Sequence, residues 1–185
     1  MKFIKTLIII SMFFFSSAKA EGSSKPQDIY GFEFESIENK KIKLSDYKNK
    51  VVMIVNTACL CGLTPQFAEL EKLWQKYKDK DFVLIGVPSD NFGGQELDSE
   101  KEVAEYTQKN FKITFPLTKI YNVKGKEAHP FYNFAADEVS ALGTPKWNFH
   151  KYLIGKDGKI AEWYASTTTP DSEKISSKIE ELLAK

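Results

Sequence analysis

The chain has 185 residues, enough for one domain with a buried core and too few for two of ordinary size. Hydrophobic residues make up 42% and charged residues 28%, a balance typical of a folded protein and not of a disordered chain. All 26 basic residues are lysines and the formal net charge is +1, which argues against a nucleic-acid partner and against an anion site built on arginine.

The first twenty residues have the features of an export leader. Lys2 and Lys5 precede an apolar run over residues 7–15, and Ala18 and Ala20 are small residues where a signal peptidase needs them. The run is too short to span a bilayer, so we expect cleavage after Ala20. An uncleaved anchor is the alternative.

Export would leave a domain of residues 21–185, either periplasmic or secreted. Cleavage of the leader would remove three lysines and no acidic residue, so the formal net charge would change from +1 to −2. This charge gives no basis for binding nucleic acid.

The chain has two cysteines, Cys59 and Cys61, separated by one residue. Disulfides that strengthen an exported domain usually close long loops, and these two cannot. Together with His129 and His150 they also lack the paired spacing of a structural zinc site, so no metal is expected. Redox chemistry is the remaining interpretation.

Short alternating segments open the expected domain. Tyr30, Phe32 and Phe34 alternate as in a strand, and Ile42 and Leu44 suggest a second one. We expect these segments to form an N-terminal hairpin packed on the main sheet.

An unbroken apolar run over residues 51–55 predicts a strand that is covered on both faces. A helix over residues 64–78 is predicted next, with Thr64 as its N-cap and Pro65 as its first residue. Its apolar side chains recur at helical spacing: Phe67, Leu70, Trp74 and Tyr77.

Cys61 therefore lies between the end of a buried strand and the start of a helix. Unpaired backbone N–H groups and the positive end of a helix dipole favour an anion there, which would lower the thiol pKa. The alternative is that both cysteines are small buried side chains near a turn.

Residues 82–87 form a second apolar run of strand length, so strand, helix and strand predict a parallel βαβ unit. The loop over residues 89–98 follows this strand as Cys61 follows the first. Because the carboxyl ends of parallel strands share one edge of the sheet, we expect Cys61 and this loop to lie together.

The remaining elements complete an α/β order. Ser99 and Glu102 form a predicted capping box for a helix reaching Asn110. The segments that follow are a mixed connection over residues 111–123, a short helix at 130–136, a strand hairpin over 147–164, and a last helix starting at 169–171 with Ile175, Ile179 and Leu182 or Leu183 inward. This order predicts a thioredoxin-like fold with an N-terminal hairpin and an insertion over residues 98–141.

Three segments carry recognisable motifs: Asn56 to Thr64 (NTACLCGLT), Asn91 to Glu96 (NFGGQE) and Trp147 to Phe149 (WNF). Together they resemble the glutathione peroxidase family, over nearly the whole of residues 21–185. The resemblance implies a thiol-dependent peroxidase that reduces hydrogen peroxide and organic or lipid hydroperoxides, with no cofactor and no metal.

By this resemblance Cys61 is the peroxidatic cysteine, and Gln95, Trp147 and Asn148 complete a catalytic tetrad. A peroxidase needs a thiolate that attacks one peroxide oxygen while donors stabilise the charge growing on the other. Two amides and an indole N–H are donors that do not titrate, so these residue types suit that task.

The chain departs from the family at several positions, among them Asp90 and Asn91, which replace Asn-Gln. Ser89 stands where the family loop has a cysteine, and Thr107 stands where many relatives carry a resolving cysteine on the following helix. Cys59 stands where the family usually has serine. The short stretch from Ala136 to Trp147 resembles that of the monomeric, phospholipid-hydroperoxide type.

Other functions and the partners stay open at this stage. The chain could be a thiol-disulfide oxidoreductase using Cys59 and Cys61, or a peroxide sensor that is oxidised only once. As a peroxidase it needs a hydroperoxide and a thiol reductant, either glutathione or a thioredoxin-like protein, and we expect a monomer.

Cys59 is the candidate resolving residue. Residues i and i+2 of a strand face the same way with Cα atoms about 6.5 Å apart, near the limit of a disulfide. A turn starting at Leu60 would shorten that distance. We favour the rival, in which an external thiol reduces Cys61 directly and Cys59 is a buried spectator.

Overall fold

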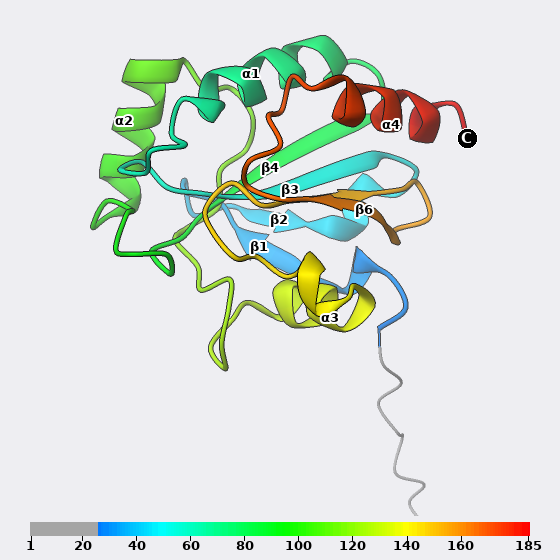
Figure 1. Ribbon diagram of the computed structural model, residues 1–185, viewed down its shortest axis with the longest axis horizontal. Helices are drawn as coiled ribbons and strands as arrows, with labels where there is room; N and C mark the ends of the chain where they lie inside the picture. Colours follow the sequence, from blue (N-terminus) through cyan, green and yellow to red (C-terminus); the bar gives the residue numbers. More distant parts are fainter. Residues whose placement is uncertain (1–25) are drawn as a thin grey trace, which may run out of the picture.

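A computed structural model describes residues 26–185; the expected signal peptide lies outside these residues. Its core is a four-stranded sheet in the order β4-β3-β5-β6, in which β3 and β4 are parallel and the other neighbours are antiparallel (Figure 1). The strands are β3 (Val51–Thr57), β4 (Phe82–Pro88), β5 (Lys151–Ile154) and β6 (Ile160–Tyr164).

Residues 51–55 of β3 and the whole of β4 are apolar because both faces of the sheet are covered there. Along β3, Val51, Met53 and Val55 face one hydrophobic cluster, whereas Val52 and Ile54 face the other. The predicted parallel βαβ unit is confirmed, with Val51 opposite Phe82 and Thr57 opposite Pro88.

Helices cover the first face. The helices α1 (Gln66–Tyr77) and α4 (Glu173–Leu183) lie side by side on it, and α2 (Glu100–Phe111) packs at its edge through Val103 (Figure 1). The apolar stripe expected for the last helix is confirmed, since Ile175, Ile179 and Leu182 are buried.

The N-terminal hairpin and a third helix cover the second face. The hairpin consists of β1 (Glu33–Glu35) and β2 (Lys41–Lys43), which form a separate two-stranded sheet, and it packs beside α3 (Pro130–Glu138) (Figure 1). The expected hairpin is confirmed, although Ile29–Gly31 and Leu44–Tyr47 are short 3-10 helices that take over the ends of the predicted strands.

Two predicted helix starts are wrong. The helix α1 begins at Gln66, one residue after the predicted Pro65. Thr64 is not its cap, because the Thr64 hydroxyl closes the preceding turn by accepting a hydrogen bond from the Cys61 N–H (3.0 Å). The helix α4 begins at Glu173 after the turns at 169–172. In α2 the expected cap is present, with Ser99 accepting from the Glu102 N–H.

The strand predicted from Trp147 begins only at Lys151. Phe149 has a φ of +65°, which bends the chain out of any strand just before β5. The consequence is that Trp147 and Asn148 lie in a turn at the end of the sheet, outside its hydrogen-bonding ladder. The insertion expected between the second and third core strands is confirmed and contains α2 and α3.

Candidate active site

Cys61 lies in a tight turn between β3 and α1, with its side chain 7% exposed. The Thr64 hydroxyl accepts from the Cys61 N–H and lies within hydrogen-bonding distance of the Ala58 and Cys61 carbonyl oxygens (3.0 and 2.6 Å). The Leu63 N–H donates to Cys61 Sγ (3.4 Å). A backbone donor therefore points at the sulfur, as the position between strand and helix predicts.

Gln95 reaches this turn from the loop after β4. The Leu60 N–H donates to the Gln95 carbonyl oxygen (2.9 Å), which ties the loop to the residue next to Cys61. Gly93 and Gly94 have φ values of +78° and +62°, and glycine is the residue that adopts them at least cost. The expectation that both strand ends meet at one edge of the sheet is confirmed.

Asn148 joins Gln95 directly. Its side-chain Nδ2 donates to Gln95 Oε1 (3.1 Å), and its side chain is fully buried. The adjacent backbone is held from the other side, because Asn56 Nδ2 donates to the Trp147 carbonyl oxygen (3.2 Å) and the Phe149 N–H donates to the Asn56 carbonyl oxygen (2.6 Å).

Trp147 differs from its neighbours because it is 41% exposed, so it is not a core anchor. Its ring lies 6.0 Å, centroid to centroid, from that of buried Phe92 in the Gln95 loop. The predicted residues thus come from three segments and converge at one end of the sheet: Cys61, Gln95, Trp147 and Asn148.

Cys59 is a free thiol and nearly inaccessible, with 2% of its surface exposed. Burial and the adjacent Glu96 carboxylate raise the pKa of its thiol far above the ordinary value. Cys61 is also a free thiol here, so no bridge joins the pair in this structure.

Two residues of the site carried no role in the sequence analysis. Glu96 is buried, and its Oε1 accepts from the N–H groups of Cys59 (3.0 Å) and Leu97 (2.9 Å), while burial raises the pKa of its carboxyl. Asn56 holds Trp147 and Phe149. Both residues lie inside the quoted motifs, but their roles depend on contacts between segments far apart in sequence.

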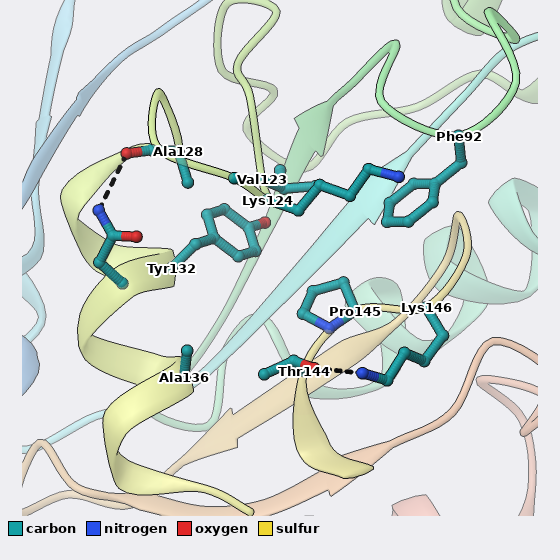
Figure 2. Close-up of a pocket in the computed structure, with 11 residues that line it drawn as sticks. Phe92, Val123, Lys124, Ala128, Tyr132, Ala136, Thr144, Pro145 and Lys146 are labelled. Carbon is teal, nitrogen blue, oxygen red and sulfur yellow. Dashed lines mark hydrogen bonds between the residues drawn. The ribbon is translucent and has the colours of Figure 1, made fainter. Parts of the chain in front are cut away.

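A hollow of about 410 Å³ has Lys146, the residue before Trp147, in its lining (Figure 2). It lies between α3 and the chain at residues 144–146, with the buried Tyr132 ring in its wall and Phe92 at one end. Lys124 Nζ lies over the Phe92 ring (4.4 Å to the centroid), and Lys146 Nζ donates to Thr144 Oγ1 (2.8 Å). The lining is mainly apolar, with lysines at its rim.

The histidines lie outside this constellation. His129 caps α3 and stacks on Phe34, and His150 is buried against Trp163. Burial lowers the pKa of His150 to about 4. Within residues 26–185 there is no group of three or more potential metal-binding side chains, and no helix there is long and apolar enough to cross a bilayer.

A thioredoxin-like sheet that brings a buried thiol, Gln95 and the Trp147–Asn148 turn to one end carries the residue types of a class, the thiol-dependent peroxidases. Comparison with known proteins gives the family. The glutathione peroxidase family profile matches residues 29–136. The chain belongs to the glutathione peroxidase family, and it is a peroxidase that reduces hydroperoxides with thiols.

Similar proteins agree with this placement. The chain is 41% identical over 158 residues to a glutathione peroxidase of Lactococcus lactis, covering 84% of this chain and 99% of that one. It is 47% identical over 139 residues to the glutathione peroxidase-like peroxiredoxin HYR1 of Saccharomyces cerevisiae, covering 74% and 84%. The crystal structure of apo Trgpx superposes with a TM-score of 0.69 at 38% identity, covering 85% and 96%.

Proposed function

We propose that Cys61 is the peroxidatic residue and that Gln95, Trp147 and Asn148 are its donors. The Cys61 thiolate attacks one peroxide oxygen, the O–O bond breaks, and the other oxygen leaves as water or an alcohol after taking up a proton. Cys61 becomes a sulfenic acid, which two thiols reduce with release of water. One observation carries the proposal. The Asn148 amide donates a hydrogen bond to the Gln95 side chain, and the Gln95 backbone carbonyl accepts one from Leu60, the residue before Cys61.

Replacing the sulfur tests this assignment. Cys61→Ser should abolish peroxide consumption, because a hydroxyl has almost no anionic form near neutral pH. Cys59→Ser is the matched control and should keep most of the activity. Full activity in Cys61→Ser would refute the assignment.

We further propose that the substrates include organic and lipid hydroperoxides as well as hydrogen peroxide. Support comes from the exposed Trp147 and Leu60 side chains, 41% and 56% exposed, and from the mainly apolar hollow lined by Phe92 and residues 144–146. A substrate with a bulky apolar group could place it in this hollow, where burial of apolar surface favours binding.

Filling the hollow separates large substrates from small ones. Ala136 lies on α3 and lines the hollow, so Ala136→Trp should slow the reduction of cumene hydroperoxide about tenfold and leave hydrogen peroxide reduction unchanged. Ala184→Trp, at the exposed end of α4, is the control. An equal effect on both substrates would contradict a role of the hollow in substrate binding.

The reductant is proposed to be an external thiol, either glutathione or a thioredoxin-like protein. Cys59 is a weak candidate for the resolving role, since a thiol that is 2% exposed and has a raised pKa is a poor nucleophile. The same burial disfavours a thiol-disulfide oxidoreductase that uses the Cys59 and Cys61 pair on protein partners. Assaying turnover with each reductant in turn identifies the donor.

We also propose that the protein is exported and works as a monomer in the periplasm or outside the cell. The leader-like composition of residues 1–20 supports export, and the short stretch from Ala136 to Trp147 supports the monomer. Intact mass of the protein from its native host should give Glu21 as the first residue. A soluble chain that starts at Met1 would refute the export proposal, and sedimentation velocity tests the monomer.

A further inference from the structure

Lys151, the first residue of β5, is a lysine with no exposed surface. Its ammonium donates to Gln66 Oε1 (2.6 Å), the Phe149 carbonyl oxygen (2.8 Å) and the Thr168 carbonyl oxygen (2.7 Å). An ammonium group has three protons, so these acceptors use all of them. A buried ammonium with all three protons hydrogen-bonded fixes the three acceptors relative to one another.

The three acceptors belong to segments that are far apart in sequence. Gln66 is the first residue of α1, directly after the turn that contains Cys61. Phe149 follows Trp147 and Asn148, and Thr168 lies in the loop between β6 and α4. Gln66 extends the link, since its Nε2 donates to the Ser166 carbonyl oxygen (2.7 Å).

Phe149 is the point at which this network acts on the donors. A φ of +65° is unfavourable for a bulky residue and persists only where the surroundings impose it. Here Asn56 holds the Phe149 N–H and Lys151 holds its carbonyl oxygen, while the ring packs edge-on against Phe67 of α1. The backbone at Phe149 in turn sets the direction of Asn148.

We propose that Lys151 is a positioning residue for peroxide reduction, fixing the segment that carries Trp147 and Asn148 relative to the helix that follows Cys61. This inference rests on the roles proposed above for those residues. Lys151 does not touch the reacting atoms; it acts through the Phe149 carbonyl and through Gln66.

The test compares two reactions of the same sulfur. Alkylation of Cys61 by iodoacetamide needs the thiolate alone, whereas reduction of peroxide also needs donors at the leaving oxygen. The ratio of the two second-order rate constants, peroxide over iodoacetamide, therefore reports donor placement and cancels changes in the thiolate fraction. Alkylated sites are assigned by peptide mass spectrometry.

Lys151→Met keeps an unbranched side chain, one atom shorter, and removes the ammonium. We expect the ratio to fall by at least about tenfold, because displacement of catalytic groups by a fraction of an ångström has effects of that size. Lys156→Met is the matched control: Lys156 also donates to a backbone carbonyl, that of Leu183, but at the far end of α4. A folded Lys151→Met protein with an unchanged ratio would overturn the proposal.

A second measurement uses the unaltered protein, so it does not depend on a variant that folds. Burial lowers the pKa of Lys151 to about 7, opposed by Glu69 of α1. A neutral amine has two N–H groups for three acceptors, so the ratio should fall as the pH rises from 6 to 9. A ratio independent of pH over this range would also overturn the proposal.

Other titrating groups near Lys151 can be separated from it. His150 has its pKa lowered to about 4, and burial raises the pKa of Tyr164, which is opposite Lys151 on β6. Burial also raises the pKa of Glu69, so the pH series is repeated in Glu69→Gln and extended to lower pH. The fall should persist there but shift to lower pH, because the Glu69 carboxylate no longer raises the pKa of Lys151. A fall that is lost at every pH in Glu69→Gln would assign it to the carboxyl and count against Lys151.

The outcomes also distinguish this inference from the proposed function. If peroxide fails to oxidise Cys61 in the unaltered protein, the proposed function is wrong. If Cys61 is oxidised rapidly but the ratio of the two rate constants changes neither in Lys151→Met nor with pH, only the positioning role is wrong.

Discussion

If Gln95 and Trp147 are donors, as proposed above, the rate of peroxide reduction should depend on each of them separately. Gln95→Ala or Trp147→Phe should each raise the barrier for oxidation of Cys61 by about 3 kcal/mol, on the order of a hundredfold in rate. Rapid-mixing assays of peroxide consumption measure this rate. Trp74→Phe, in partly buried surroundings on α1, is the control, and a rate within twofold of the parent in Trp147→Phe would contradict the donor role.

Cys59 provides a prediction about the oxidised form of the enzyme. After one equivalent of peroxide with a sulfenic-acid trap present, we expect a stable adduct on Cys61 and a Cys59 that can still be alkylated after unfolding. The reason is that Cys59 is buried beside the Glu96 carboxylate, which suppresses its thiolate. Mass spectrometry that shows a loss of two hydrogens and no adduct would instead establish a strained Cys59–Cys61 disulfide.

At the scale of elements, the cap of α2 can be removed without touching the site. Ser99 Oγ lies 3.3 Å from the Glu102 N–H and donates to the Glu102 carboxylate (2.8 Å). Ser99→Ala should lower the free energy of unfolding by about 1 kcal/mol, measured by denaturant titration, and leave activity unchanged. Ser177→Ala on the exposed face of α4 should have no effect, and equal losses in the two variants would rule out a specific cap.

The start of a helix was predicted correctly where its cap depends on nearby residues and incorrectly where the cap residue bonds elsewhere. Ser99 and Glu102 are three residues apart and cap α2 as predicted. Thr64 has the right residue type for a cap, but its hydroxyl bonds to Cys61 and Ala58 across a turn instead, and α1 begins later. The choice between these partners depends on the path of the chain after β3, which local sequence does not fix.

At the scale of the whole molecule, stability should depend on pH through His150. Burial lowers the pKa of this imidazole from 6.5 in the unfolded chain to about 4 in the folded one. The folded state therefore binds fewer protons between these values, and the free energy of unfolding should fall as the pH falls through this window. The loss attributable to His150 is on the order of 3 kcal/mol by pH 4.

Equilibrium unfolding at pH 7 and pH 4.5 measures this loss. A His150→Phe variant should lose less stability over the same interval, because it has no imidazole to protonate. An identical loss in the variant and the parent would show that His150 does not cause it.

The sequence alone determined the fold class, and its motifs gave the residues proposed above as reactive. Unbroken apolar runs in β3 and β4 fix strands that are buried on both faces, because only a sheet covered on both faces accepts them. The motifs around Gln95 and Asn148 were recognisable for a different reason. Each motif is short, and its chemistry lies in the residue types themselves.

The tertiary structure decided how those residues are held. Asn56 and Glu96 lie inside the motifs, but their contacts are not visible there, and nothing local shows that the buried Lys151 links Phe149 to Gln66 and Thr168. It also decided that Cys59 is inaccessible while Trp147 is exposed. The physical reason is that burial, and the hydrogen bonds that make burial of polar groups tolerable, arise between segments that meet only when the chain is folded.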